Sequence, residues 1–167
     1  MSKKYQKHIL QALSLSFFCL SLSPSYVLGH KQKNLETAAK KRASISTLAA
    51  SYHEFQHKFG QNEDQDYETI IPSLFSPDFK KIANGKELVS DRTKLLSQLM
   101  DAKNFAGKWT ILPEETIPSK DNTKCTIRYL LNSEKGGQFE VIAILSAPNG
   151  QIEHIEEVYY QKEKEQK

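Results

Sequence analysis

The stretch WTILPEETIPSKDNTKCTIRYLLNSEKGGQFEVIAILSAPNGQIEHIEEVYY, residues 109–160, decides the fold. It contains four strand-like runs, at 109–117, 123–132, 139–147 and 152–160. The segments between them are typical turns: Lys120-Asp121-Asn122, Glu134-Lys135-Gly136-Gly137 and Pro148-Asn149-Gly150. Because such short links join strands that run in opposite directions, we predict an antiparallel meander of four strands.

The sequence before this stretch has helical rather than strand periodicity. From Ala43, apolar residues recur every three or four positions and predict a first helix that ends at Gly60-Gln61-Asn62; they are Ile45, Leu48, Ala49, Tyr52, Phe55 and Phe59. Asp66 stands where the N-cap of a second, short helix is expected, before Ser76-Pro77-Asp78 breaks the chain.

A brief strand and a third helix complete this half. Phe79–Ala83 is expected to be a strand that turns at Asn84-Gly85. The third, amphipathic helix begins at Leu88 or after a Ser90 cap and ends near Gly107. Helices followed by strands predict an α+β fold in which the N-terminal helices pack on the concave face of a strongly curved antiparallel sheet.

Residues 1–29 have the pattern of a secretory signal peptide, with a basic start, an apolar run at 9–22 and Val27-Leu28-Gly29 before the cleavage site. The run is too short and too rich in serine for a membrane span, so we expect no stable membrane anchor after cleavage. We expect an exported protein, periplasmic or secreted. Residues 30–43 then form a polar linker, 44–160 a single domain and 161–167 a charged, disordered tail.

The predicted signal peptide changes the charge and the cysteine count of the domain. It holds three of the 23 basic residues and none of the 20 acidic ones, so the remaining chain is formally neutral. A neutral domain lacks the field that non-specific nucleic-acid binding requires, and we expect no nucleic-acid partner. Cys125 is the remaining thiol, and its apolar neighbours favour a buried structural residue over a nucleophile.

The order of elements resembles the nuclear transport factor 2-like superfamily, including its SnoaL-like and ketosteroid-isomerase-like proteins. The likeness covers about residues 44–160 and depends on Tyr52, the run from Asp66 to Leu74-Phe75-Ser76-Pro77-Asp78-Phe79, the Asn84-Gly85 turn, and Asn149-Gly150-Gln151-Ile152 before Val158-Tyr159-Tyr160. The segment 60–65 is longer than the usual link. The resemblance implies a cone with an apolar pocket, and members that are isomerases, dehydratases, cyclases or non-catalytic modules.

The isomerase-like members imply two acidic groups that this sequence lacks. The first, a carboxylate base, falls at Ala83 and Asn84, and neither can act as a base. The second, an acidic donor for an oxyanion, falls in the apolar run Ile142-Ala143-Ile144. The resemblance also implies a tyrosine on the first helix that helps to hold the oxyanion, and Tyr52 is present there. A tyrosine at such a position is also an ordinary core residue. The sequence therefore favours a protein without catalytic residues.

The run His53-Glu54-Phe55-Gln56-His57 fits the H-E-x-x-H pattern of zinc hydrolases. Both histidines are expected at the flank of the first helix, away from its apolar stripe, and no persuasive third ligand follows. We therefore assign no metal or other cofactor, and keep His53 and His57 as alternative metal ligands in a zinc-dependent hydrolase.

The last strand supplies a possible polar group for the pocket. Its alternation places Glu153, Ile155, Glu157 and Tyr159 on one face, which by resemblance lines the pocket. A carboxylate there needs a partner, and Arg128 is the natural candidate, although a rim salt bridge is an equal alternative. The predicted pocket residues are Tyr52, Trp109, Arg128, Tyr129, Glu157 and Tyr159.

The function that we infer from the sequence is an exported, non-catalytic binding or interaction module. Its partner is a small, partly apolar ligand or another protein. The alternatives are a SnoaL-like isomerase or dehydratase, the zinc-dependent hydrolase, and a homodimer formed through the outer face of the sheet, which predicts exposed apolar residues on the last strands.

Overall fold

A computed structural model of the chain describes residues 43–162. The predicted signal peptide, nearly all of the predicted linker and residues 163–167 of the predicted tail lie outside this range. The elements are, in order, α2 (Ile45–Gln61), α3 (Tyr67–Leu74), β1 (Phe75–Ala83), β2 (Lys86–Val89), the 3-10 helix η1 (Arg92–Lys94), α4 (Leu95–Ala106), β3 (Trp109–Pro118), β4 (Lys124–Ser133), β5 (Gly137–Ser146) and β6 (Ile152–Gln161).

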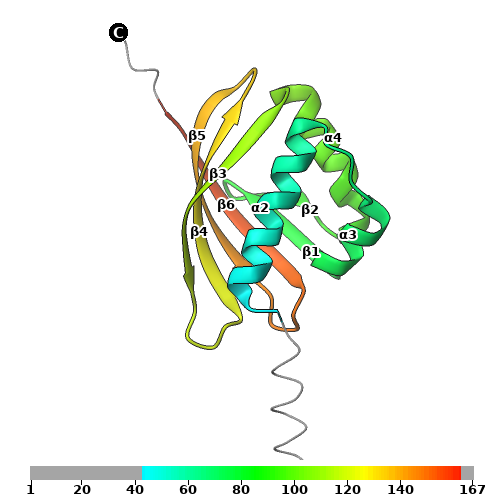
Figure 1. Cartoon of the computed structure of the whole chain (residues 1–167), viewed down its shortest axis with the longest axis vertical. Helices are drawn as coiled ribbons and strands as arrows, with labels where there is room; N and C mark the ends of the chain where they lie inside the picture. The colour runs from blue at the N-terminus through cyan, green and yellow to red at the C-terminus, as the bar shows by residue number, and fades with distance from the viewer. Residues whose placement is uncertain (1–42, 163–167) are drawn as a thin grey trace, which may run out of the picture. The chain divides into compact units, whose positions relative to one another are not determined.

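The six strands form one curled sheet with the order β2-β1-β6-β5-β4-β3. The helices lie on one side of it, and α2 runs along its hollow (Figure 1). The α+β class and the antiparallel pairing of β3 to β6 are confirmed. The sheet as a whole is mixed, not antiparallel as predicted, because β1 pairs in parallel with β6. Most of the domain lies between β1 and β6 in the sequence. No short turn therefore joins the two strands, and the sequence has no local signal for their pairing.

The helix boundaries follow local capping chemistry. The hydroxyl of Ser44 accepts a hydrogen bond from the Thr47 amide, which begins α2. Asn62, with a left-handed φ of 64°, ends that helix. Asp66 caps α3 through the Thr69 amide, as predicted.

The link between α3 and α4 differs from the prediction in two places. Strand β1 begins at Phe75 rather than at Phe79, directly after α3. Residues Lys86–Val89 form an edge strand, so Leu88 does not begin the third helix. The reason is the turn at Asn84 and Gly85, whose φ angles of 49° and 76° fit the tight two-residue turn of a β-hairpin.

The core lies between α2 and the inner face of the sheet. It is built from aromatic and branched side chains, with Phe75, Phe79, Ile127, Val141 and Ile155 fully buried. Close approach matters at Gly60, where a Cβ atom would collide with Trp109 at the start of β3. This packing fixes α2 against the sheet and so positions the side chains described below.

The outer face of the sheet is less polar than expected for a solvated surface. Ile142, Ile144, Val158 and Tyr160 are exposed there at alternate positions of β5 and β6. This is the pattern that the homodimer hypothesis predicts, while the homodimer itself stays a prediction. Within residues 43–162, no helix is long and apolar enough to span a membrane.

Candidate functional site

A cavity of about 240 Å³ lies between α2, α4 and the inner face of the sheet. We call it the Lys81 cavity. Its wall is mostly apolar, and the polar groups that line it come from separate elements: Gln56 on α2, Lys81 on β1, Gln98 on α4, Ser133 on β4 and Tyr159 on β6. The apolar side chains that line it are Leu88, Leu99, Ala102, Phe105, Ala106, Trp109, Leu131 and Phe139.

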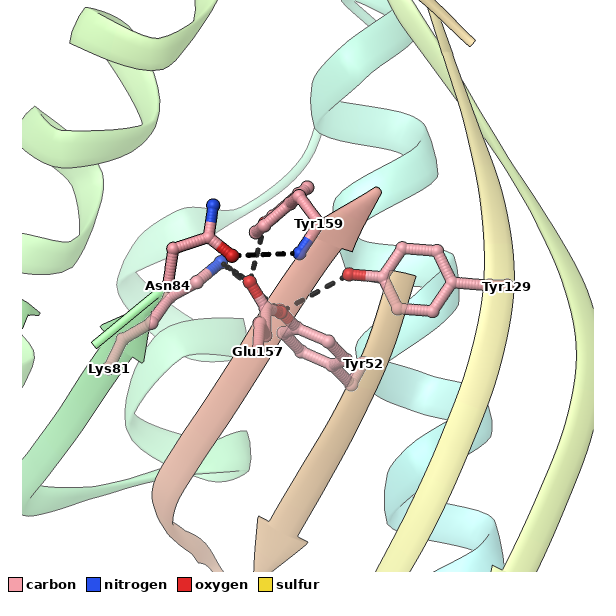
Figure 2. Close-up of polar contacts among 6 residues, drawn as sticks. All are labelled: Tyr52, Lys81, Asn84, Tyr129, Glu157 and Tyr159. Atoms are coloured by element: carbon pink, nitrogen blue, oxygen red, sulfur yellow. Dashed lines mark hydrogen bonds and ion pairs between the residues drawn. The ribbon is translucent and has the colours of Figure 1, made fainter. Parts of the chain in front are cut away.

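A buried carboxylate lies behind this lining. Glu157 on β6 is fully buried, and three phenols donate hydrogen bonds to it (Figure 2). Tyr52 and Tyr129 donate to its Oε1 at 2.6 and 3.2 Å, and Tyr159 donates to its Oε2 at 2.5 Å. We call these residues, together with Lys81, the Glu157 cluster. Charge-assisted bonds of this kind are stronger than neutral ones, so the cluster holds its members in place.

Lys81 is the positive partner of Glu157. Its Nζ lies 3.0 Å from Oε2 of the carboxylate and donates to the Tyr52 hydroxyl at 3.3 Å. The side chains of both charged residues are at least 95 % buried. A buried charge without a partner is costly, so this pair explains how a glutamate is tolerated in the core.

The ionisation of the cluster follows from burial and from the charge of Lys81. Burial raises the pKa of Glu157, but the Lys81 ammonium and the phenols outweigh it and hold the pKa below the ordinary value. Burial, together with the nearby Glu157 charge, raises the pKa of Tyr52, Tyr129 and Tyr159 well above the ordinary value. At neutral pH the cluster is therefore a carboxylate held by an ammonium and three protonated phenols.

Strand alternation explains why these residues meet. Ile155, Glu157 and Tyr159 lie on the inner face of β6, as the sequence predicts. On β1, Lys81 shares the inner face with buried Phe79. The side chain of Asn84 fixes the end of β1 to β6, because its Oδ1 accepts the backbone N–H of Tyr159 at 3.0 Å (Figure 2).

The cluster leaves one donor for the cavity. An ammonium has three N–H groups, and those of Lys81 that bond to Glu157 and Tyr52 account for two. Lys81 also lines the cavity, and its third N–H has no partner among the described residues. The arrangement can stabilise a carbonyl oxygen or a developing oxyanion inside an apolar enclosure.

Of the pocket residues predicted from the sequence, Trp109 and Tyr159 line the cavity, whereas Tyr52, Tyr129 and Glu157 lie behind its lining. Tyr52, Tyr129 and Tyr159 converge on Glu157. Trp109 is buried in the cavity wall, where its indole N–H donates to the backbone oxygen of Gln56 at 3.0 Å.

The predicted pairing of Arg128 with Glu157 is wrong. Arg128 follows the inward residue Ile127 on β4, so its side chain lies on the outer face and is about half exposed. There it pairs with Glu114 at 3.0 Å and with Glu140 at 3.5 Å. The alternative, a solvated salt bridge between Arg128 and Glu157 at the rim, is wrong too, because Glu157 is fully buried and pairs with Lys81.

The H-E-x-x-H residues do not form a metal site. His53 is buried, not at a solvent-exposed flank as predicted, and its ring packs 5.0 Å from that of Tyr129. His57 accepts the Ile111 amide through Nδ1, and Glu54 pairs with Lys58. Within residues 43–162, no group of three or more His, Cys, Asp or Glu residues could hold a metal ion.

Four polar residues of the cavity were missed in the sequence: Lys81, Gln56, Gln98 and Ser133. A signal existed for Lys81 and Gln56. Lys81 is two residues from Phe79 in a predicted strand, so alternation places it inward. Gln56 is one helical turn after Tyr52 and therefore lies on the apolar face of α2. For Gln98 no comparable signal exists, because α4 is only partly buried.

The order of the elements and the curled six-stranded sheet with α2 along its hollow (Figure 1) identify the fold. The chain has the nuclear transport factor 2-like fold. Its structure is similar to that of a nuclear transport factor 2-like protein of unknown function from an Exiguobacterium species, with a TM-score of 0.55 and 16% identity over 70% of this chain and 100% of the other. No protein-family model and no curated protein matches the sequence.

Other structures with this fold carry functional names. A proposed SnoaL-like polyketide cyclase from a Jannaschia species has a TM-score of 0.57 and 8% identity, over 71% of this chain and 90% of its own. A proposed ketosteroid isomerase from Kribbella flavida has a TM-score of 0.54 and 11% identity, over 74% of this chain and 82% of its own. The predicted resemblance to the nuclear transport factor 2-like superfamily is confirmed at the level of the fold.

Proposed function

We propose that the Lys81 cavity binds a small, largely apolar molecule whose carbonyl or similar oxygen accepts a hydrogen bond from Lys81. The observation that supports this most is the remaining N–H of Lys81 at a mostly apolar cavity wall. The cavity, about 240 Å³, is smaller than the roughly 300–1,000 Å³ of sites for drug-sized ligands. The ligand is therefore a small one, of one or two rings.

We propose further that the protein acts on this ligand as a SnoaL-like isomerase or dehydratase. Such reactions remove a proton next to a carbonyl and place negative charge on the carbonyl oxygen, which the Lys81 ammonium would stabilise. Among the described residues, no carboxylate or histidine lines the cavity, so the proton would pass to water. The names of several structures with the same fold, cyclases and isomerases, favour this function over a non-catalytic one.

Non-catalytic binding is the second candidate, and the composition of the cavity favours it. No described residue that lines the cavity is a carboxylate or a histidine, so no ordinary base faces the ligand. Glu157 is fully buried, and the donors of the cluster occupy both of its oxygens.

One experiment separates the two candidates. The protein is incubated in heavy water with α-tetralone, a bicyclic ketone of suitable size. Binding is followed by the fluorescence of Trp109, the one tryptophan of the chain, and proton transfer is followed by NMR as exchange of the hydrogens next to the carbonyl. Binding with accelerated exchange supports the enzyme, and binding without it supports the binding module. No binding of this ketone or its ring-substituted derivatives would overturn both.

The matched variants test the role of Lys81. Lys81→Met combined with Glu157→Gln removes both buried charges together, which avoids leaving one of them unpaired. We expect this double variant to lose ketone binding. Lys80→Met is the control, because Lys80 is exposed on the same strand and lies outside the cavity.

We propose also that the protein is exported and acts in the periplasm or outside the cell. The basic start and apolar run of residues 1–29 support this. The mass of the protein isolated from its own host tests it, since a cleaved chain would begin near His30. A mass that includes residues 1–29 would contradict export by cleavage.

A further inference from the structure

Two glutamine side chains face the Lys81 cavity from different helices. Gln56 belongs to α2 and is 94 % buried, and Gln98 belongs to α4. Both line the cavity. The Nε2 atom of Gln56 and the Oε1 atom of Gln98 are buried and have no hydrogen-bond partner among the residues that the structure describes.

Unpaired amide atoms are unfavourable in a protein interior. Buried polar groups are nearly always hydrogen-bonded, and an apolar side chain of similar length would avoid the defect. Here the two residues that carry such atoms line the same small cavity, and one atom is a donor while the other is an acceptor. A ligand group that can both accept and donate is able to pair with either amide.

We propose that Gln56 and Gln98 form a second polar subsite of the cavity, and that the ligand carries a hydroxyl group there. This inference rests on the proposed function, because it requires that the cavity binds the ligand through Lys81. A hydroxyl both donates and accepts, so it pairs with either amide in either orientation of the amide group. The ligand is thus a small hydroxy-ketone: its carbonyl contacts Lys81 and its hydroxyl contacts the glutamines.

The test compares α-tetralone with a set of its ring-hydroxylated isomers, with Trp109 fluorescence as the measure of affinity. We expect at least one isomer to bind about tenfold more tightly than the parent ketone, since one added pair of good hydrogen bonds has that effect. Gln56→Met and Gln98→Met should remove this advantage, so that the hydroxylated isomer binds each variant no more tightly than α-tetralone does. Gln138→Met is the control, because Gln138 is exposed and its amide bonds to Asn132 outside the cavity.

A second readout needs no ligand. If the amides are unpaired in the free protein, replacing either one by methionine raises the melting temperature or leaves it unchanged. If they instead hold the fold together, the same changes lower it, and the subsite would be overturned.

The two proposals fail in different ways. If ketone binding depends on Lys81 but all hydroxylated isomers bind no better than α-tetralone, the subsite is wrong and the proposed function stands. If neither the ketone nor its isomers bind, the proposed function is wrong, and the hydroxy-ketone assignment is overturned with it.

Discussion

Lys81→Met alone should destabilise the protein severely at neutral pH. It leaves the carboxylate of Glu157 fully buried without an ammonium partner. Breaking a buried ion pair by removing one member costs about 3–5 kcal/mol. The three phenols still donate to the carboxylate, so we expect the lower end, about 3 kcal/mol.

The loss of stability in Lys81→Met should depend on pH. In the parent protein the pKa of Glu157 is lowered, so the cluster stabilises the fold above the unfolded pKa and that stabilisation is lost as the pH falls through the folded pKa. In Lys81→Met, burial acts without the ammonium and raises the folded pKa above about 4.3, the unfolded value. The difference in the free energy of unfolding between Lys81→Met and the parent protein therefore becomes smaller as the pH falls.

The measurement is the free energy of unfolding by urea at neutral pH and at about pH 4.5, just above the unfolded pKa of the glutamate. Adding Glu157→Gln to Lys81→Met should recover most of the loss, because no buried charge is then unpaired. Lys80→Met, on the exposed side of the same strand, should change the free energy by less than about 0.5 kcal/mol. A loss below about 1 kcal/mol for Lys81→Met, with the same value at both pH values, would refute the buried ion pair.

Three further predictions concern residues outside the cavity lining. Arg128→Ala should lower the free energy of unfolding in urea by less than about 1 kcal/mol and leave ketone affinity unchanged, because the ion pairs of Arg128 are on the exposed outer face. A loss of ketone affinity would show that Arg128 contributes to the binding site. Burial raises the pKa of Cys125 to about 11, so iodoacetamide should modify it only after unfolding, and rapid labelling of the native protein would show that the thiol is accessible. Burial, opposed by the Glu157 charge, lowers the pKa of His53 to about 4, so its NMR signals should show no protonation down to about pH 5. Its contribution to stability then declines as the pH falls from 6.5 towards 4, and a titration near 6.5 would contradict its burial.

Local patterns in the sequence were enough to predict most of the fold. The alternation on β6 correctly placed Glu157 and Tyr159 on the inner face, and the turn signals gave the meander of β3 to β6. The parallel pairing of β1 with β6 was missed because it joins residues about 75 positions apart, with no local sequence signal between them.

The candidate site was harder to predict for a physical reason. A buried Glu157 requires a cationic partner, and the side chains of Arg128 and Lys81 are both cations that could pair with it. The choice between them depends on which face of a strand is inward, and a shift of one residue reverses the face. The absence of an isomerase carboxylate at Ala83 and Asn84 stays a prediction from the resemblance. Strand alternation and helical spacing place Lys81 and Gln56 inward, but only the fold shows that they line the same cavity.

The proposed hydrogen bond from Lys81 to the ligand's carbonyl oxygen is open to an NMR titration with α-tetralone. The titration follows the side-chain nitrogen of Lys81 alongside the fluorescence of Trp109. We predict that both signals change with the same midpoint, while the nitrogen of exposed Lys80 does not move. A fluorescence change without any response at Lys81 would show that the ketone binds elsewhere, and would contradict the proposed contact with Lys81.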